Sequence, residues 1–283
     1  MDYVSRFILE NLDIRGAIVR LGASWRLMQA GRNYSIAAGS LLGQMTAVTA
    51  LLGNNLKTPG RLSFQVKGDG AISLMVVDCD ERLRLRGMVK APGNLEPAPL
   101  ASLFGNGQLM LTLHADAENI HPYQSLVPLE GDSLAGIFEN FLALSEQAPA
   151  RLWLMADAAY ACGLFLQKLP NADRKDADGW NRMQILAETV TAADLVLPAE
   201  GLLGRIFGEE DIRLFPPREV TYHCPRDDAK VIEMLRAIGR DELAGLLAER
   251  GEIYIQDEIC NCDYRFGPEL LDQLFPSPNH SQQ

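Results

Sequence analysis

Residues 61–76 read RLSFQVKGDGAISLMV, and this stretch predicts the fold most directly. Apolar and polar side chains alternate along its first seven residues, which is the period of a half-buried strand. A turn-forming sequence follows at Gly68, Asp69 and Gly70, and the alternation resumes at Ile72. This pattern predicts a β-hairpin and hence an antiparallel sheet.

The same kind of alternation outside the hairpin predicts further strands. Residues 82–86 and 109–113 read RLRLR and LMLTL, and residues 14–21 alternate as an edge strand would. Asp132 and Ser133 precede apolar residues at helical spacing and are expected to cap a helix. Antiparallel sheets packed with helices are typical of the α+β class.

One segment, Asn33–Leu56, contains no charged residue and is long enough to cross a membrane. However, polar side chains are spread along it, and no aromatic or basic anchors flank it symmetrically. We therefore expect a buried core helix, capped by Asn33 or Ser35, and no membrane partner.

Composition changes along the chain indicate its domain organisation. A polar, charged stretch at residues 171–179 suggests a hinge or exposed loop, and residues 180–215 look helical with breaks at Pro198 and Gly201. We predict an N-terminal α+β domain over 1–170, a helical linker over 171–217, a small C-terminal module over 218–275 and a disordered tail over 276–283.

The composition limits the functional classes. The chain has 283 residues, 47% apolar and 22% charged, which is typical of a globular protein. A net charge of −11 without a Lys/Arg cluster argues against nucleic acid as a partner. The odd number of cysteines, five, argues against a secreted disulfide scaffold, and charged residues interrupt the N-terminus where a signal peptide needs an apolar core. We expect a cytoplasmic protein.

Three of the five cysteines lie in two short segments laid out like the ligand knuckles of a zinc ribbon. Residues 220–225 read VTYHCP and residues 251–266 read GEIYIQDEICNCDYRF, with two amphipathic helical segments between them. A structural zinc site needs four donors, usually in Cys or His pairs. Here the first knuckle supplies one thiol, Cys224, and the second supplies Cys260 and Cys262.

Three interpretations of these residues are open. In the first, Cys224, Cys260, Asp257 and either Cys262 or His223 form a remodelled metal site. In the second, Cys224 forms a single disulfide with Cys260 or Cys262 and acts as a one-step redox switch. In the third, the site has degenerated, and apolar packing of the helical spacer replaces the metal.

The other candidate groups predict no catalytic site. Cys79 and Cys162 lie in apolar stretches and are expected to be buried. His114 and His121 are expected in surface loops, and residues 145–147, SEQ, are expected to form caps or hydrogen bonds between elements. No Ser/His/Asp order, phosphate-binding loop or dinucleotide fingerprint is present. We expect neither an enzyme nor a nucleotide cofactor.

Short motifs spread over nearly the whole chain share an order and spacing with one known family. They are DIRG (13–16), VRL (19–21), LLG (41–43), GRLSFQVKGDG (60–70), VDCD (77–80), RG (86–87), SEQ (145–147), LQKLP (166–170) and LLGRIF (202–207). In these motifs the chain resembles the heat-shock protein 33 family of redox-regulated holdase chaperones. The resemblance implies an α+β N-terminal domain, a metastable helical linker and a C-terminal zinc module that serves as the redox switch.

The resemblance also implies a ligand set, from which this chain departs. In that family four cysteines, C-x-C and then C-x-x-C, hold zinc when reduced; oxidation forms two disulfides, releases the metal, and unfolds the module and linker. Cys224 and Cys260 match the second cysteine of each pair, but Tyr222 and Asp257 stand at the first positions, and Cys262 is additional. Zinc is therefore the cofactor that the resemblance implies, with two of its four ligands replaced.

The expected function follows from the resemblance and from this departure. We expect an ATP-independent holdase of the stress response that binds unfolded or misfolded client proteins, forms a homodimer, and has an altered or lost zinc and thiol switch. A second hypothesis is a dedicated protein-interaction module that kept the fold without general chaperoning. A third is a thiol oxidoreductase that uses Cys260 and Cys262. The sequence does not predict the client-binding residues.

Overall fold

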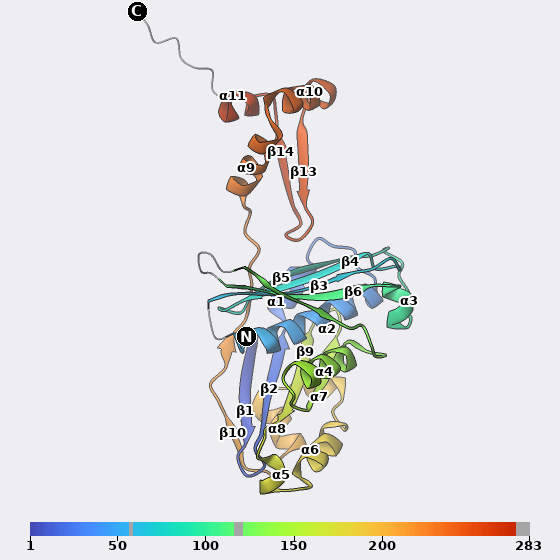
Figure 1. The fold of residues 1–283 in the computed structure, drawn as a ribbon, viewed down its shortest axis with the longest axis vertical. Coiled ribbons are helices and arrows are strands. Elements are labelled where there is room, and N and C mark those ends of the chain that lie inside the picture. The colour runs from blue at the N-terminus through green and yellow to red at the C-terminus, as the bar shows by residue number, and fades with distance from the viewer. Residues whose placement is uncertain (57–58, 116–120, 276–283) are drawn as a thin grey trace, which may run out of the picture. The chain divides into compact units, whose positions relative to one another are not determined.

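The computed structural model describes residues 1–56, 59–115 and 121–275 (Figure 1). They form two compact units, Met1–His223 and the chain from Cys224 onward. Residues 171–217 belong to the first unit together with 1–170, so the boundaries predicted at 170 and 217 stay a prediction. The predicted disordered tail, 276–283, lies outside the described residues.

The first unit contains two six-stranded sheets. The first sheet includes both strands of the N-terminal hairpin and one strand of the linker. Its strands are β1 (Tyr3–Leu9), β2 (Ile14–Leu21), β8 (Ala150–Ala156), β9 (Ala161–Lys168), β10 (Ile212–Leu214) and β11 (Arg218–Glu219). The order is β10-β1-β2-β9-β8, with β11 also paired to β1, and all pairs are antiparallel.

The prediction that residues 14–21 form an edge strand is wrong. Strand β2 lies between β1 and β9 and is paired with both along its length. Its two faces are both buried, because Val19 packs into one apolar cluster and Ile18 into another on the opposite side. A strand covered on both faces can carry a nearly continuous apolar run.

The second sheet contains the predicted hairpin. Its strands, in order across the sheet, are β12 (Thr221–Tyr222), β5 (Arg84–Lys90), β4 (Leu74–Asp80), β3 (Gly60–Lys67), β6 (Gln108–Ala115) and β7 (Tyr123–Val127). Strands β3 and β4 pair antiparallel from Arg61–Asp80 to Lys67–Leu74, which confirms the hairpin. The strands predicted at 82–86 and 109–113 correspond to β5 and β6, and only the β12–β5 pair is parallel among the described strands.

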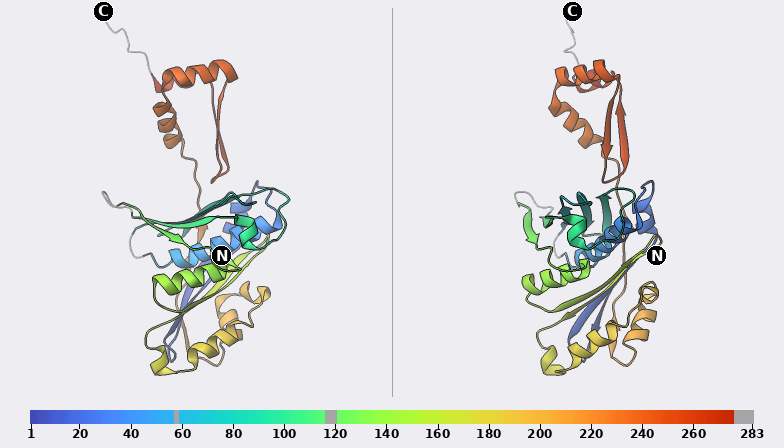
Figure 2. Two further views of the ribbon diagram at one scale, coloured as in Figure 1. Left: turned by 45° about the vertical axis from the view of Figure 1, so that its right-hand side comes forward. Right: turned by 90° about the vertical axis from the view of Figure 1, so that its right-hand side faces the viewer.

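The long apolar helix lies between the two sheets, as Figure 2 shows. It is α2 (Ile36–Gly53), and the predicted Ser35 cap is confirmed, since the Ser35 hydroxyl accepts the Ala38 N–H at 3.2 Å. The helix is long and apolar enough to cross a membrane, yet 78% of it is buried inside the fold. The smaller helices here are α1 (Ala23–Gln29), α3 (Leu100–Phe104) and α4 (Leu134–Ser145), and Ser133 caps α4 as predicted.

The linker covers the other face of the first sheet. Its helices are α5 (Ala172–Lys175), α6 (Gly179–Ala187), α7 (Ala192–Leu195) and α8 (Ala199–Ile206). Pro198 precedes α8, as the predicted break requires, but the break predicted at Gly201 is wrong, because this glycine lies inside α8. Residues 212–214 were expected to be helical and instead form β10, which extends the sheet beside β1.

The second unit is a small helical module with one hairpin. It contains α9 (Asp228–Ile238), α10 (Arg240–Arg250), β13 (Ile253–Asp257), β14 (Cys262–Phe266) and α11 (Leu270–Leu274). Its main apolar cluster is formed by buried residues of the three helices and the first residue of β13: Leu235, Leu243, Leu247, Ile253, Leu270 and Leu274. This is a small core for about fifty residues, which is the regime in which metals or disulfides usually add stability.

Candidate functional site

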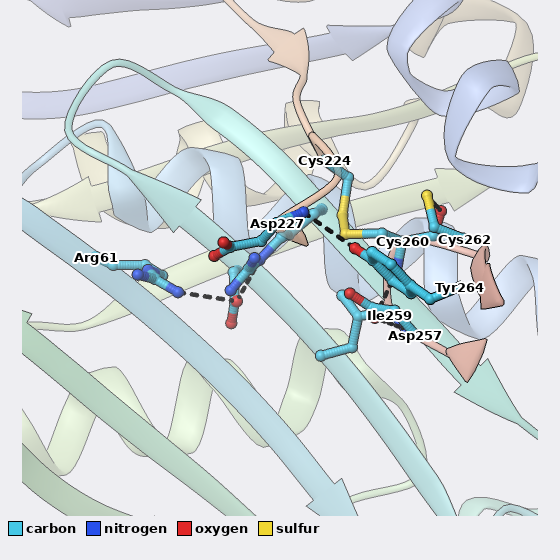
Figure 3. Close-up of a disulfide and its surroundings, with 10 residues drawn as sticks. Arg61, Cys224, Asp227, Asp257, Ile259, Cys260, Cys262 and Tyr264 are labelled. Carbon is cyan, nitrogen blue, oxygen red and sulfur yellow. Dashed lines mark hydrogen bonds and ion pairs between the residues drawn. A yellow bond between two sulfur atoms is a disulfide. The ribbon is translucent and has the colours of Figure 1, made fainter. Parts of the chain in front are cut away.

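The candidate site lies at the turn end of the β13–β14 hairpin (Figure 3). Cys224 and Cys260 are joined by a disulfide, with their Cα atoms 5.3 Å apart and a sequence separation of 36. Cys262 is a free, half-buried thiol whose sulfur donates to the Cys260 carbonyl oxygen at 3.4 Å. Of the three candidate redox cysteines, the structure therefore pairs the two that match family positions.

Asp257 shapes the turn that carries Cys260. Its carboxylate accepts the backbone N–H groups of Ile259 at 2.9 Å and Cys260 at 3.1 Å, while Asn261 has a positive φ of 53°. An aspartate that accepts from residues two and three positions later forms an Asx-type turn, and asparagine tolerates the left-handed region well. Asp257 thus holds the Cys260 backbone in place rather than extending toward a shared ligand position.

Tyr264 is the residue that the sequence prediction missed. Its side chain is 1% exposed, and its hydroxyl oxygen accepts the Asp227 N–H at 3.0 Å. The Arg226 guanidinium lies over the Tyr264 ring at 4.3 Å and donates to the Asp263 carbonyl oxygen at 2.8 Å. The chain that follows Cys224 is therefore fixed to β14 by polar and cation–π contacts as well as by the disulfide. The available signal was the alternation in residues 262–266, which places Tyr264 on one face of a strand.

The chain that leads into Cys224 runs across both sheets of the first unit, and we name residues 218–223 the strap. Arg218 and Glu219 pair with β1, and Thr221 and Tyr222 pair with β5. Val220 between them is 2% exposed. Tyr222 is thus part of a sheet and packs against the main apolar core, which is a structural role for the residue at the family's first cysteine position.

The residues present do not fit a tetrahedral zinc site. Tyr222 and Asp257 replace two thiols, the Asp257 carboxylate accepts two backbone N–H groups, and the Cys224 and Cys260 sulfurs are bonded to each other. Among residues 1–56, 59–115 and 121–275, no three His, Cys, Asp or Glu side chains are placed to hold a metal ion. Four well-placed donors are what a structural zinc requires.

The two other cysteines are buried as predicted. Cys79 and Cys162 are both 0% exposed, one in β4 and one in β9. Burial raises the pKa of the Cys162 thiol to about 11 and raises the pKa of Cys79 still further. Both are therefore protonated, unreactive thiols at neutral pH.

The remaining predictions on polar residues are partly correct. Glu146 forms the expected hydrogen bond between elements, accepting from the Gln167 side-chain amide at 2.8 Å. His121 is exposed outside regular structure, as expected. His114 is also exposed, but it lies in β6 rather than in a loop, because the alternation of that strand continues to Ala115.

Comparisons with known proteins agree with this architecture. The family model described as Hsp33 protein matches residues 2–267. The 33 kDa chaperonin of Nitrosococcus oceani is 38% identical over 275 residues, covering 97% of this chain and 94% of the relative. The 33 kDa chaperonin of Methylobacillus flagellatus is 37% identical with the same coverage.

A solved structure shows the same fold. The crystal structure of the 33 kDa chaperonin (heat shock protein 33 homolog) from Thermotoga maritima matches with a TM-score of 0.79 at 23% identity, covering 96% of this chain and 97% of that one. The sequence relatives support a chaperone function, with binding of client proteins, and the matched family is not an enzyme family. By the match to its family model and by these relatives, the chain belongs to the Hsp33 family.

Proposed function

We propose that this protein is an ATP-independent holdase that binds unfolding polypeptides in the cytoplasm. We further propose that it works without zinc, with a thiol switch reduced to Cys224 and Cys260. The observation that carries the holdase proposal is an apolar sheet face covered by the linker. On β1, β2 and β9 this face contributes Phe7, Leu9, Ile14, Ile18, Leu164 and Leu166.

The linker buries this face through residues of short helices rather than through one long helix. Met183, Leu202 and Leu203, from α6 and α8, are at most 3% exposed. The outer faces of these helices carry exposed side chains, including Ile185 of α6, which is 56% exposed. Short helices that pack through one face open more easily than a continuous core does. Detachment of the linker would present several neighbouring apolar side chains, which is the kind of surface that binds an unfolded segment.

The test is light scattering from a thermally unfolding model client, with and without ATP. We expect near-stoichiometric suppression of aggregation that ATP does not change. Failure to protect any client, with saturable binding to one protein, would instead support the dedicated interaction module.

Two linker variants test the role of the covered face. Leu202→Asp, at a position with no exposure, is expected to weaken linker packing and raise holdase activity. Ile185→Asp, at an exposed position of the same linker, is the matched control and is expected to behave like the unmodified protein. Equal activity of both variants would contradict the covered-face mechanism, provided that near-ultraviolet circular dichroism shows both to be folded.

A further inference from the structure

The Cys224–Cys260 disulfide connects two parts of the C-terminal module that lie outside its apolar cluster. The buried residues of this cluster lie on the helices and at Ile253, the first residue of β13, and the partly buried Ile255 and Phe266 of the hairpin pack against them. Ile253 pairs with Phe266, whereas the turn end begins at the pair Asp257–Cys262. Along β13 the last residue that packs against the cluster is Ile255, and the turn end begins beyond it at Asp257, where the disulfide lies.

The loop that the disulfide closes contains most of the module. Between Cys224 and Cys260 lie α9, α10 and β13. A crosslink over a loop of this length removes conformational freedom from the unfolded chain. This stabilisation does not depend on how many apolar side chains the small core buries. The contacts of Arg226, Asp227 and Tyr264 act at the same end of the module.

We propose that oxidation stabilises the C-terminal module of this protein and that reduction loosens it, a redox response of opposite sign to the one that the family resemblance implies. In the family pattern, each disulfide forms within a C-x-C or C-x-x-C pair. Such a disulfide closes a loop of only a few residues, and the thiolates that form it no longer hold zinc. A disulfide between the two knuckles instead fixes the start of the module to its hairpin turn.

The chemistry is balanced with a peroxide as oxidant. One thiolate attacks the O–O bond of hydrogen peroxide, which gives a sulfenic acid and, after protonation, one water. The second thiol attacks the sulfenic sulfur, so that the S–S bond forms and a second water leaves. A dithiol reductant reverses the process by thiol–disulfide exchange.

This inference deepens the proposed function, because it assigns the regulation of the same module. Its test reads the folding of residues 224–275 directly, by hydrogen–deuterium exchange of the full chain in dithiothreitol and after peroxide. We expect amides of β13 and β14 to exchange at least ~10-fold more slowly after oxidation, the lower end of what a closed loop of this length supplies. Amides of β3 and β6 are the internal reference and are expected not to change.

Three cysteine variants separate the pairing from other thiol chemistry. Cys224→Ser and Cys260→Ser should each exchange at the fast rate under both conditions, and Cys262→Ser should keep the full response. Peptide mapping of the oxidised protein should find the Cys224–Cys260 link with the loss of two hydrogens. A Cys224–Cys262 link, an unchanged exchange rate, or faster exchange after peroxide would each overturn the proposal, whatever the client assay shows.

Discussion

Asp2 and Val220, separated by almost the whole first unit in sequence, are bound to each other through the backbone. The Val220 N–H donates to the Asp2 carbonyl oxygen at 3.0 Å, and the Val220 carbonyl oxygen accepts the Ser24 hydroxyl at 3.2 Å. Asp2 also accepts three consecutive N–H groups at the start of α1 through its carboxylate, including those of Gly22 at 2.8 Å and Ser24 at 2.5 Å. The N-terminus thus fixes α1 and the strap together, directly before the C-terminal module begins in the sequence.

Asp2→Ala is expected to destabilise the first unit by about 1–3 kcal/mol, since it leaves buried N–H groups without an acceptor. Asp2→Asn keeps one acceptor oxygen and should cost less. All three tryptophans lie at positions 25, 153 and 180, so tryptophan fluorescence during urea denaturation reports this unit alone. Equal stability of Asp2→Ala and the unmodified protein would show that water replaces the carboxylate.

The same carboxylate predicts a pH dependence. Burial raises the pKa of Asp2, but the N–H groups of Ser24, Gly22 and Ala23 together outweigh burial and lower the pKa below its ordinary value. Because the folded-state pKa is depressed, the stabilisation is complete above the unfolded value of roughly 4 and is lost as the pH falls through the folded value. The stability difference between unmodified protein and Asp2→Ala should therefore be constant from pH 7 to about pH 5 and shrink below it. A difference that stays constant down to pH 3 would contradict this assignment.

Two glycines of α2 make a matched pair for testing how tightly the helix fits between the sheets. A Cβ on Gly43 would lie 2.4 Å from the Ala156 Cβ and 3.0 Å from the Trp25 ring, whereas on Gly39 the nearest atom would be 3.8 Å away. Gly43→Ala should destabilise by about 1–3 kcal/mol through overpacking. Gly39→Ala should be neutral or stabilise by up to about 1 kcal/mol, because alanine is the better helix former. Urea denaturation of both variants measures this, and equal effects would mean that α2 shifts freely.

The sequence predicted those parts of the fold whose signal is local. The alternation around Phe64 gave the hairpin, and Ser35 gave the start of α2, because periodicity and capping depend on neighbouring residues. The central position of β2 could not be predicted in this way, since it depends on β9, far along the chain, which pairs with its second edge. The burial of its second face likewise depends on the distant linker. Chain alternation alone cannot distinguish a strand with one buried face from a strand with two.

The candidate site shows the same limit. The sequence identified Cys224, Cys260 and Cys262, but it could not choose between the two partners of Cys224. The choice depends on the turn formed by Asp257 and Asn261, and on the contact between Asp227 and Tyr264 across 37 residues. Both are three-dimensional relationships that residue spacing does not encode.

Thiol labelling of the folded, reduced protein should separate the cysteines into two groups. Cys79 and Cys162 are fully buried with raised pKa values, so iodoacetamide should not reach them within hours at pH 7.5. Cys224, Cys260 and Cys262 should label after reduction, and only Cys262 should label after peroxide. Intact mass spectrometry with peptide mapping reads each position. Rapid labelling of Cys162 would show that β9 opens in the native state.

Restoring the two replaced ligands tests the zinc interpretation by gain of binding. Protein purified under reducing conditions, without added metal or chelator, is expected to contain far less than one zinc per chain, because only two family ligands remain. The double variant Tyr222→Cys/Asp257→Cys recreates the C-x-C and C-x-x-C spacing and should bind about one zinc. Each single variant is the control and should bind much less, since three thiols leave the tetrahedral site incomplete.

Metal analysis measures the zinc content of all four proteins. About one zinc in the unmodified protein would mean that Cys262, His223 or Asp257 completes a site after the disulfide is reduced. The redox response would then have to be explained through metal release rather than through loop closure.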